Sequence, residues 1–200
     1  MTRKERALTD NPRATGPLHA LLPPVGGPAD AGLVLAVESC LGLLNLRVDP
    51  AAVWPFDGAP PAANRFVAGD DVTAAWLGPD EFLVITALDQ LAATADWLAG
   101  ALAGHHAGVT EVSDHLTVIR LSGSRARWVL AKGCALDLHP RVFEPGDCAQ
   151  TLFERAGITL LQRDAAPTYH LLVRRSFAAY LWAWLVDAGQ EVGVRFEGLS

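Results

Sequence analysis

The chain has 200 residues, of which 50% are hydrophobic and 19% are charged, and its formal net charge at pH 7 is −6. This length and apolar content allow a sizeable core in one large domain or in two closely packed small ones, with apolar surface left to bury against another chain. The acidic balance argues against a nucleic-acid partner, because sixteen scattered Lys and Arg residues do not supply a basic patch for phosphates.

The first 30 residues are rich in Pro, Gly and charge, and their apolar cluster consists of Leu18, Leu21 and Leu22. This composition predicts an extended arm over residues 1–30 that orders only on a partner, followed by a folded domain over residues 31–200. No apolar run follows the basic start, and no later run reaches the roughly 18 residues of a membrane span. We therefore expect a cytoplasmic protein without a membrane partner.

Short apolar or alternating runs between turn residues predict ten strands. They cover residues 33–37, 43–48, 72–77, 81–88, 109–112, 115–121, 149–153, 157–162, 169–174 and 192–196. A Pro- and Gly-rich stretch at 53–64 predicts a long loop, and the turn 78–80 predicts an antiparallel hairpin.

Helical spacing of apolar residues predicts three helices, over residues 90–103, 125–131 and 177–188. Each is preceded by a residue suited to an N-cap and followed by a glycine suited to a helix end, namely Asp89 and Gly104, Ser124 and Gly133, and Ser176 and Gly189. Strand, cap and helix recur in the same order at 81–103 and 169–188, which indicates a weak internal duplication. We expect an α+β fold of antiparallel sheets with helices packed on one face, as a single domain or as two packed α/β subdomains.

The sequence contains no glycine-rich nucleotide loop, phosphate loop or serine-nucleophile elbow. Its three cysteines, Cys40, Cys134 and Cys148, are odd in number and lack a C-x-x-C pair, which favours reduced thiols. The histidines lack the spacing of a zinc site, so we expect neither a metal nor another cofactor on this chain. Two motifs that are rich in polar residues contain His115, Cys134, Asp137 and His139. For these four residues we favour a structural or interface role over a catalytic one.

Two arginines, Arg174 and Arg175, precede the last helix, which is apolar or aromatic around almost its whole circumference. They could bind an anion at the helix start, or they could hold a carboxylate across a subunit interface. We favour the interface, because the charges are few and an apolar helix needs to be buried on more than one side. The expected contact residues are Arg174, Arg175, Phe177, Tyr180 and Trp184.

Several motifs occur in one order at residues 76–83, 112–140, 143–151 and 173–185. Together they resemble the gamma subunit family of heterotetrameric sarcosine oxidase, and the resemblance covers about residues 72–190. The same framework is similar to the folate-binding aminomethyltransferases, which implies an aminomethyltransferase-like architecture. Those enzymes carry a Gly-Gly-Ile-x-Asp-Asp segment whose carboxylate serves the transfer. Here the matching stretch, residues 156–161, ends in Leu160 and Leu161, so the resemblance implies the scaffold without the acid.

The resemblance implies a non-catalytic gamma subunit that supports oxidative demethylation of sarcosine to glycine, with the one-carbon unit passed to tetrahydrofolate. Its partners would be the alpha, beta and delta subunits. The implied cofactors lie on those partners, with NAD and folate on alpha, the flavins FAD and FMN on beta, and zinc on delta. Two alternatives stay open: a free-standing folate-binding protein that lacks the catalytic carboxylate, and a structural subunit of a related N-methyl amino-acid dehydrogenase.

Overall fold

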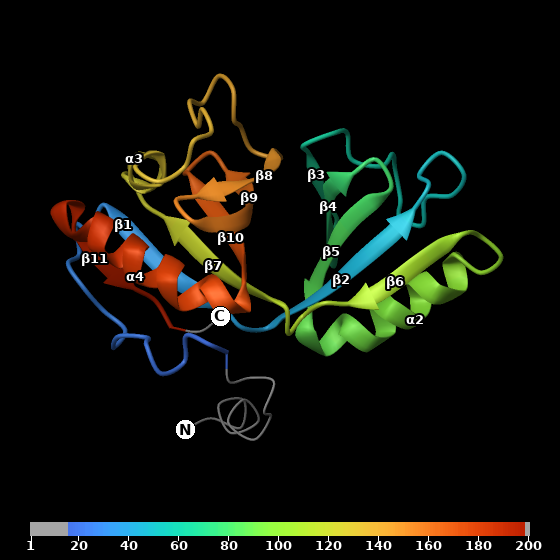
Figure 1. Ribbon diagram of the computed structural model, residues 1–200, viewed down its shortest axis with the longest axis horizontal. Helices are drawn as coiled ribbons and strands as arrows, with labels where there is room; N and C mark the ends of the chain where they lie inside the picture. Colours follow the sequence, from blue (N-terminus) through green and yellow to red (C-terminus); the bar gives the residue numbers. More distant parts are fainter. Residues whose placement is uncertain (1–15, 199–200) are drawn as a thin grey trace.

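The computed structural model describes residues 16–198, which form two β-sheets packed face to face (Figure 1). The six-stranded sheet has the order β11-β1-β7-β10-β9-β8 and the five-stranded sheet the order β3-β4-β5-β2-β6. The first contains β1 (Leu33–Glu38), β7 (Leu116–Ser122), β8 (Cys148–Phe153), β9 (Ala156–Asp164), β10 (Thr168–Arg174) and β11 (Val194–Phe196). The second contains β2 (Leu41–Val48), β3 (Phe66–Ala68), β4 (Val72–Gly78), β5 (Glu81–Ala87) and β6 (Ala107–Glu111). Neighbouring strands are antiparallel throughout, except that β1 and β11 are parallel.

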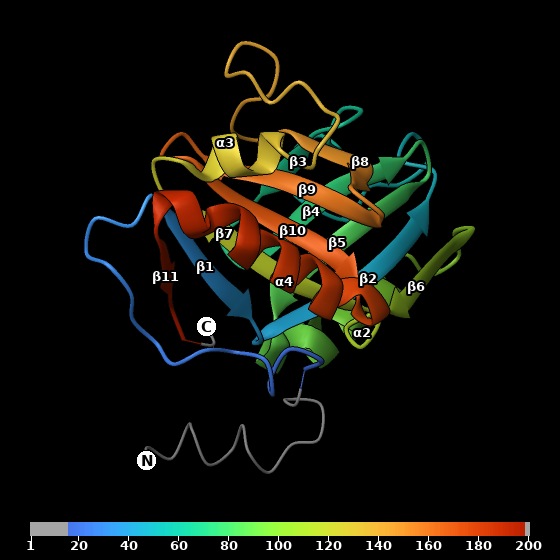
Figure 2. The same cartoon turned by 60° about the vertical axis from the view of Figure 1, so that its left-hand side comes forward.

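Helices cover the outer face of each sheet. Helices α3 (Ala126–Ala131) and α4 (Ala178–Gly189) pack on the six-stranded sheet, and Figure 2 shows α4 in front of β7 and β10. Helix α2 (Leu91–Ala101) packs on the five-stranded sheet. The predicted α+β class, with antiparallel sheets and helices on one face, is confirmed.

Alternation along the strands divides the buried side chains among three cores. On β10, Leu171 faces the helices, whereas Leu172 faces the other sheet. On β2, Leu44 faces α2, whereas Leu43 belongs to the core between the sheets. Both sheets are therefore buried on two sides, which explains the high apolar content of the chain.

The internal duplication predicted from sequence is present in the structure. Strand β5 leads through the 3₁₀ turn η2 (Leu88–Gln90) into α2, and β10 leads through η3 (Arg175–Phe177) into α4. The chain crosses from one sheet to the other twice, after β1 and after β6. These two crossovers, residues 39–40 and 112–115, lie at the same end of the sheets (Figure 1).

The predicted N-caps are wrong at all three helices. The N-cap positions belong to Gln90, Arg125 and Phe177, and none of them makes a side-chain capping bond. Asp89 and Ser176 instead lie within the 3₁₀ turns that lead into α2 and α4. In such turns some backbone N–H groups at the start of the helix already have an acceptor. The N–H of Ala178, for example, donates to the carbonyl of Arg175, so fewer N–H groups are left for a capping side chain.

The described part of the N-terminal arm, residues 16–30, packs on the domain. Leu18 is only 1% exposed and belongs to the helix-side core. Farther along, Gly26 and Phe196 exchange two backbone hydrogen bonds, of 2.9 and 2.7 Å. The predicted extended arm therefore lies against its own domain from residue 16 onward, and residues 1–15 of that prediction lie outside the described residues.

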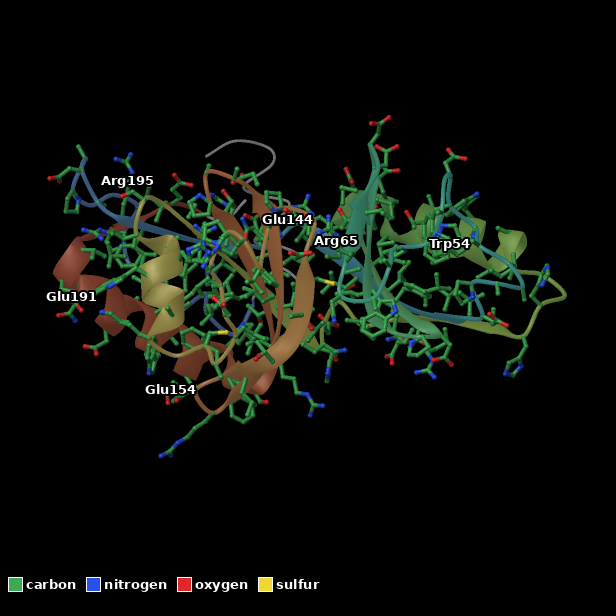
Figure 3. The ribbon with its side chains drawn as sticks, turned by 90° about the horizontal axis from the view of Figure 1, so that it is seen from above. Trp54, Arg65, Glu144, Glu154, Glu191 and Arg195 are labelled. Atoms are coloured by element: carbon green, nitrogen blue, oxygen red, sulfur yellow. The ribbon has the colours of Figure 1, made fainter. Side chains whose placement is uncertain are left out.

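The two sheets are also joined where their edges meet. The N–H of Phe66, on edge strand β3, donates to the carbonyl of Gly146 at 2.8 Å, and the N–H of Cys148, on edge strand β8, donates to that of Asn64 at 2.9 Å. The Arg65 guanidinium contacts the carboxylates of Asp147 and of Glu144, the latter at 3.2 Å (Figure 3). Crossovers at one end and this edge contact elsewhere fix how the sheets lie relative to each other.

Gly133 follows α3, and a glycine that ends a helix commonly adopts a left-handed conformation, but Gly133 is not among the glycines with positive φ. A glycine is needed there for space, because an added Cβ would lie 2.7 Å from two ring atoms of the buried Phe153 and 3.1 Å from Trp184. We expect Gly133→Ala to lower the free energy of unfolding by about 1–3 kcal/mol, since rigid rings cannot move aside easily. Urea unfolding measures the change, and Gly157→Ala, with nothing within 4 Å, is the control. Equal midpoints for the two variants would contradict this packing.

Candidate functional site

The structure separates the predicted site residues into three places. His115, Arg174, Arg175 and Phe177 come together where β10 enters α4 and the second crossover passes. Tyr180 and Trp184 lie farther along α4. The remaining three, Cys134, Asp137 and His139, lie in the loop between α3 and β8.

The two arginines differ in their surroundings, although both are exposed. The backbone N–H of Arg175 donates to the carbonyl of His115 at 2.9 Å, and its guanidinium lies 4.0 Å from the Asp114 carboxylate. Within residues 16–198, the Arg174 side chain makes neither a hydrogen bond nor an ion pair. Arg174 is therefore a cation available to another molecule.

Arg174 lines a cleft of about 540 Å³ between the two sheets, which we call the inter-sheet cleft. Its floor is apolar and comes from both sheets, with Leu83, Leu116 and Leu172 among its residues. Its polar lining includes His115, Gln150, Asn45 and Glu81. The Glu81 carboxylate is already paired, since it accepts from Arg47 and from Asn45 at 2.8 Å each. The cleft thus combines an apolar floor with one uncompensated guanidinium at its rim.

Four aromatic side chains on α3, η3 and α4 are exposed or half-buried, and one of them, Phe177, also lines the cleft. We call this group the aromatic face, and it comprises Trp128, Phe177, Tyr180 and Trp184. Phe177 is 41% exposed, Tyr180 38% and Trp128 41%. Trp184 is half-buried and packs edge-on against Phe153, with ring centroids 4.7 Å apart. Aromatic residues are enriched in protein interfaces, so this face has the composition of a contact surface.

The loop between α3 and β8 is held by its own polar groups. The Asp137 carboxylate accepts from the N–H of His139 at 2.9 Å, and the His139 Nδ1 accepts from the N–H of Arg141 at 3.2 Å. Cys134 is buried, and its strand-like bridge to Phe153 ties the loop to β8. These contacts support the structural interpretation, since the polar atoms are used within the loop.

The thiol of Cys148 is poorly suited to nucleophilic chemistry. Burial raises its pKa to about 11, and the thiol lies 3.2 Å from the carbonyl oxygen of Arg65. The reactive thiolate is therefore scarce at neutral pH. Over residues 16–198, no group of three His, Cys, Asp or Glu side chains has the arrangement of a metal site. In the same range, no helix has the length and apolarity needed to cross a membrane.

Sequence reasoning missed a group of charges on the inner face of the six-stranded sheet. Arg120 donates to Glu38 at 2.6 Å, and Arg163 crosses to the other sheet to donate to the Thr73 hydroxyl at 3.2 Å. Burial lowers the pKa of the nearby His170 to about 4, and the charge of Arg163 adds to the effect. The sequence did contain a signal for this group. His170, Leu172 and Arg174 alternate along β10, and alternate residues of a strand lie on the same face.

The model of the family described as sarcosine oxidase, gamma subunit family, matches residues 47–191. The sarcosine oxidase subunit gamma of Corynebacterium sp. (strain U-96) is 38% identical over 133 residues, a segment that makes up 66% of this chain and 63% of that relative. The match therefore spans less than two thirds of the relative's own length.

Two solved structures share the fold. A chain of the heterotetrameric sarcosine oxidase from Corynebacterium sp. U-96 superposes with a TM-score of 0.77 and 31% identity, over 88% of this chain and 95% of that one. The glycine cleavage system aminomethyltransferase T from Bartonella henselae superposes with a TM-score of 0.64 over 84% of this chain and 48% of that one. At 16% identity, the second comparison shows the fold alone. The aminomethyltransferase-like architecture expected from sequence is confirmed.

Proposed function

Because the chain belongs to the sarcosine oxidase gamma subunit family, we propose that it is an accessory subunit of a heterotetrameric sarcosine oxidase whose chemistry takes place on other chains. In this proposal the complex is cytoplasmic, oxidises sarcosine to glycine and passes the one-carbon unit to tetrahydrofolate. The alpha, beta and delta subunits are the partners. They carry NAD, the flavins, zinc and the folate, and this chain binds none of these cofactors.

The likeness to a chain of a heterotetrameric enzyme, over nearly the full length of both, supports the proposal most directly. The aromatic face adds to it, since three exposed aromatic side chains around α3 and α4 offer apolar area to a partner. A catalytic role for this chain has less support. Leu160 and Leu161 are both 0% exposed, in the helix-side core and the inter-sheet core respectively, so neither side chain reaches a cleft.

Co-expression with the proposed partner chains tests the function. We expect this chain to purify with the flavin-bearing subunit in a 1:1 ratio and to remain with it through size exclusion. A stable monomer that ignores those chains would contradict the proposal. The competing function, folate binding by a free-standing chain, predicts saturable binding of folinic acid to the isolated chain, and we expect none by calorimetry.

Removal of both arginines before α4 should weaken assembly more than it weakens the fold. For Arg174→Ala combined with Arg175→Ala, we expect the dissociation constant of the complex to rise at least tenfold, because charge-assisted contacts contribute about 1.5–3 kcal/mol each. Both side chains are exposed, so the thermal midpoint of the isolated chain should change little. Size exclusion at dilute protein measures assembly, and unchanged dissociation would remove these residues from the interface.

A further inference from the structure

We propose that the inter-sheet cleft receives an extended segment of a partner subunit, which inserts an apolar side chain between the sheets and places a carboxylate on Arg174. This inference rests on the proposed function, because it names the chemistry of the partner that the complex must supply. It concerns the cleft, which meets the aromatic face at Phe177, whereas Trp128, Tyr180 and Trp184 do not line it.

The chain itself shows how such a space can be filled. On the other side of the second crossover, the turn formed by residues 16–22 packs Leu18 into the helix-side core and lines a cavity of about 80 Å³. Ser113 and Asp114 of the crossover line that small cavity, whereas Val112 and His115 line the cleft. Within the described part of the chain, no comparable segment enters the cleft, whose volume is about 540 Å³.

The lining of the cleft defines what can enter it. Leu83, Leu116 and Leu172 provide an apolar floor, which an aliphatic or aromatic side chain can cover. At the rim, Glu81 pairs with Arg47, which also pairs with Asp80, and Arg175 faces Asp114. Among the described residues, Arg174 is the cation of the cleft lining that has no ionic partner. A carboxylate matches a guanidinium in charge and in two-pronged geometry, which makes an acidic group the complement of this rim.

Site-specific photocrosslinking in the assembled complex tests the inference. The probe, p-benzoylphenylalanine, is placed at Gln150 in the cleft, at Tyr180 on the aromatic face and at Asp96 on the exposed side of α2 as a control. We expect Gln150 to crosslink to a partner peptide that contains Asp, Glu or a C-terminal carboxylate, and Asp96 to give no crosslink.

The outcomes separate this inference from the proposed function. Crosslinking from Tyr180 without crosslinking from Gln150 would overturn the occupied cleft and leave the accessory role standing. A Gln150 crosslink to a peptide without a carboxylate would overturn the charge pairing. If the chain does not assemble with the partners at all, the proposed function fails first, and the inference fails with it.

Single arginine variants give a second measurement. We expect Arg174→Gln to raise the dissociation constant of the complex about tenfold or more, and Arg174→Lys to recover part of the loss, since Lys keeps the charge without the bidentate geometry. Arg175→Gln is the matched control, because Asp114 already faces that side chain. An effect of Arg175→Gln as large as that of Arg174→Gln would contradict the assignment.

Discussion

Replacement of Leu160 by aspartate is expected to lower the free energy of unfolding by more than about 4 kcal/mol, a large share of the roughly 5–15 kcal/mol that stabilises a typical domain. Leu160 is 0% exposed in the helix-side core, and its cross-strand neighbours are Leu171 and Ala149. The substitution would remove the packing of a buried leucine and would place a carboxyl group in an apolar site.

Two matched variants make this prediction specific. Leu160→Met keeps the volume and should cost less than about 1.5 kcal/mol. Leu161→Asp should cost less than Leu160→Asp, because Leu161 faces the inter-sheet core, where the imidazole of its cross-strand neighbour His170 can donate a hydrogen bond to the carboxyl group. Urea unfolding followed by circular dichroism compares all three. If Leu160→Asp unfolds at the same midpoint as Leu160→Met, Leu160 does not lie in an apolar core.

Acidification from pH 7 to pH 5 is expected to remove about 2 kcal/mol of stability through His170 alone. In the folded chain burial lowers the pKa of His170 to about 4. In the unfolded chain the imidazole has its ordinary pKa of about 6.5. The unfolded state therefore binds the proton more tightly, so this contribution is present in full above about pH 6.5 and is lost progressively as the pH falls toward 4.

The groups that face His170 explain the low pKa and supply the control. Burial is the largest cause and, like Arg163 and Arg120, it opposes protonation, whereas Glu38 and Asp164 favour protonation. His170→Gln keeps a polar side chain that cannot take up a proton in this pH range. We expect its urea midpoint to fall less between pH 7 and pH 5 than that of the unchanged chain. Identical pH dependence in the two proteins would show that His170 titrates normally in the fold.

Local periodicity predicted most of the fold because each sheet is buried on both faces and the strands are bounded by turns. The runs at 81–88 and 169–174 correspond to β5 and β10 almost residue for residue. Strand β3 was missed, since three residues after a Pro-rich loop carry no measurable alternation. The N-caps were misplaced because Asp89 and Ser176 have suitable side chains, and only the backbone shows that a 3₁₀ turn comes first.

The candidate site was predictable in part. Two charged residues, Arg174 and Arg175, directly precede an apolar helix in the sequence. This order indicated that the start of α4, including Phe177, is a contact surface. The inter-sheet cleft could not be predicted, since its lining comes from strands as distant in sequence as β2 and β10 and depends on how the two sheets pack. Whether Arg174 or Glu81 has an ionic partner within the described residues also depends on tertiary neighbours, so the sequence could not show it.

The way β1 joins the six-stranded sheet has a consequence for synthesis on the ribosome. The five-stranded sheet comes from one stretch, residues 41–111, and its strands can pair as soon as that stretch has been made. Strand β1 is made earlier, yet its partners β7 and β11 are made about eighty and a hundred and sixty residues later. An apolar strand must therefore wait unpaired while about eighty further residues are made, a period in which aggregation or chaperone capture competes with folding.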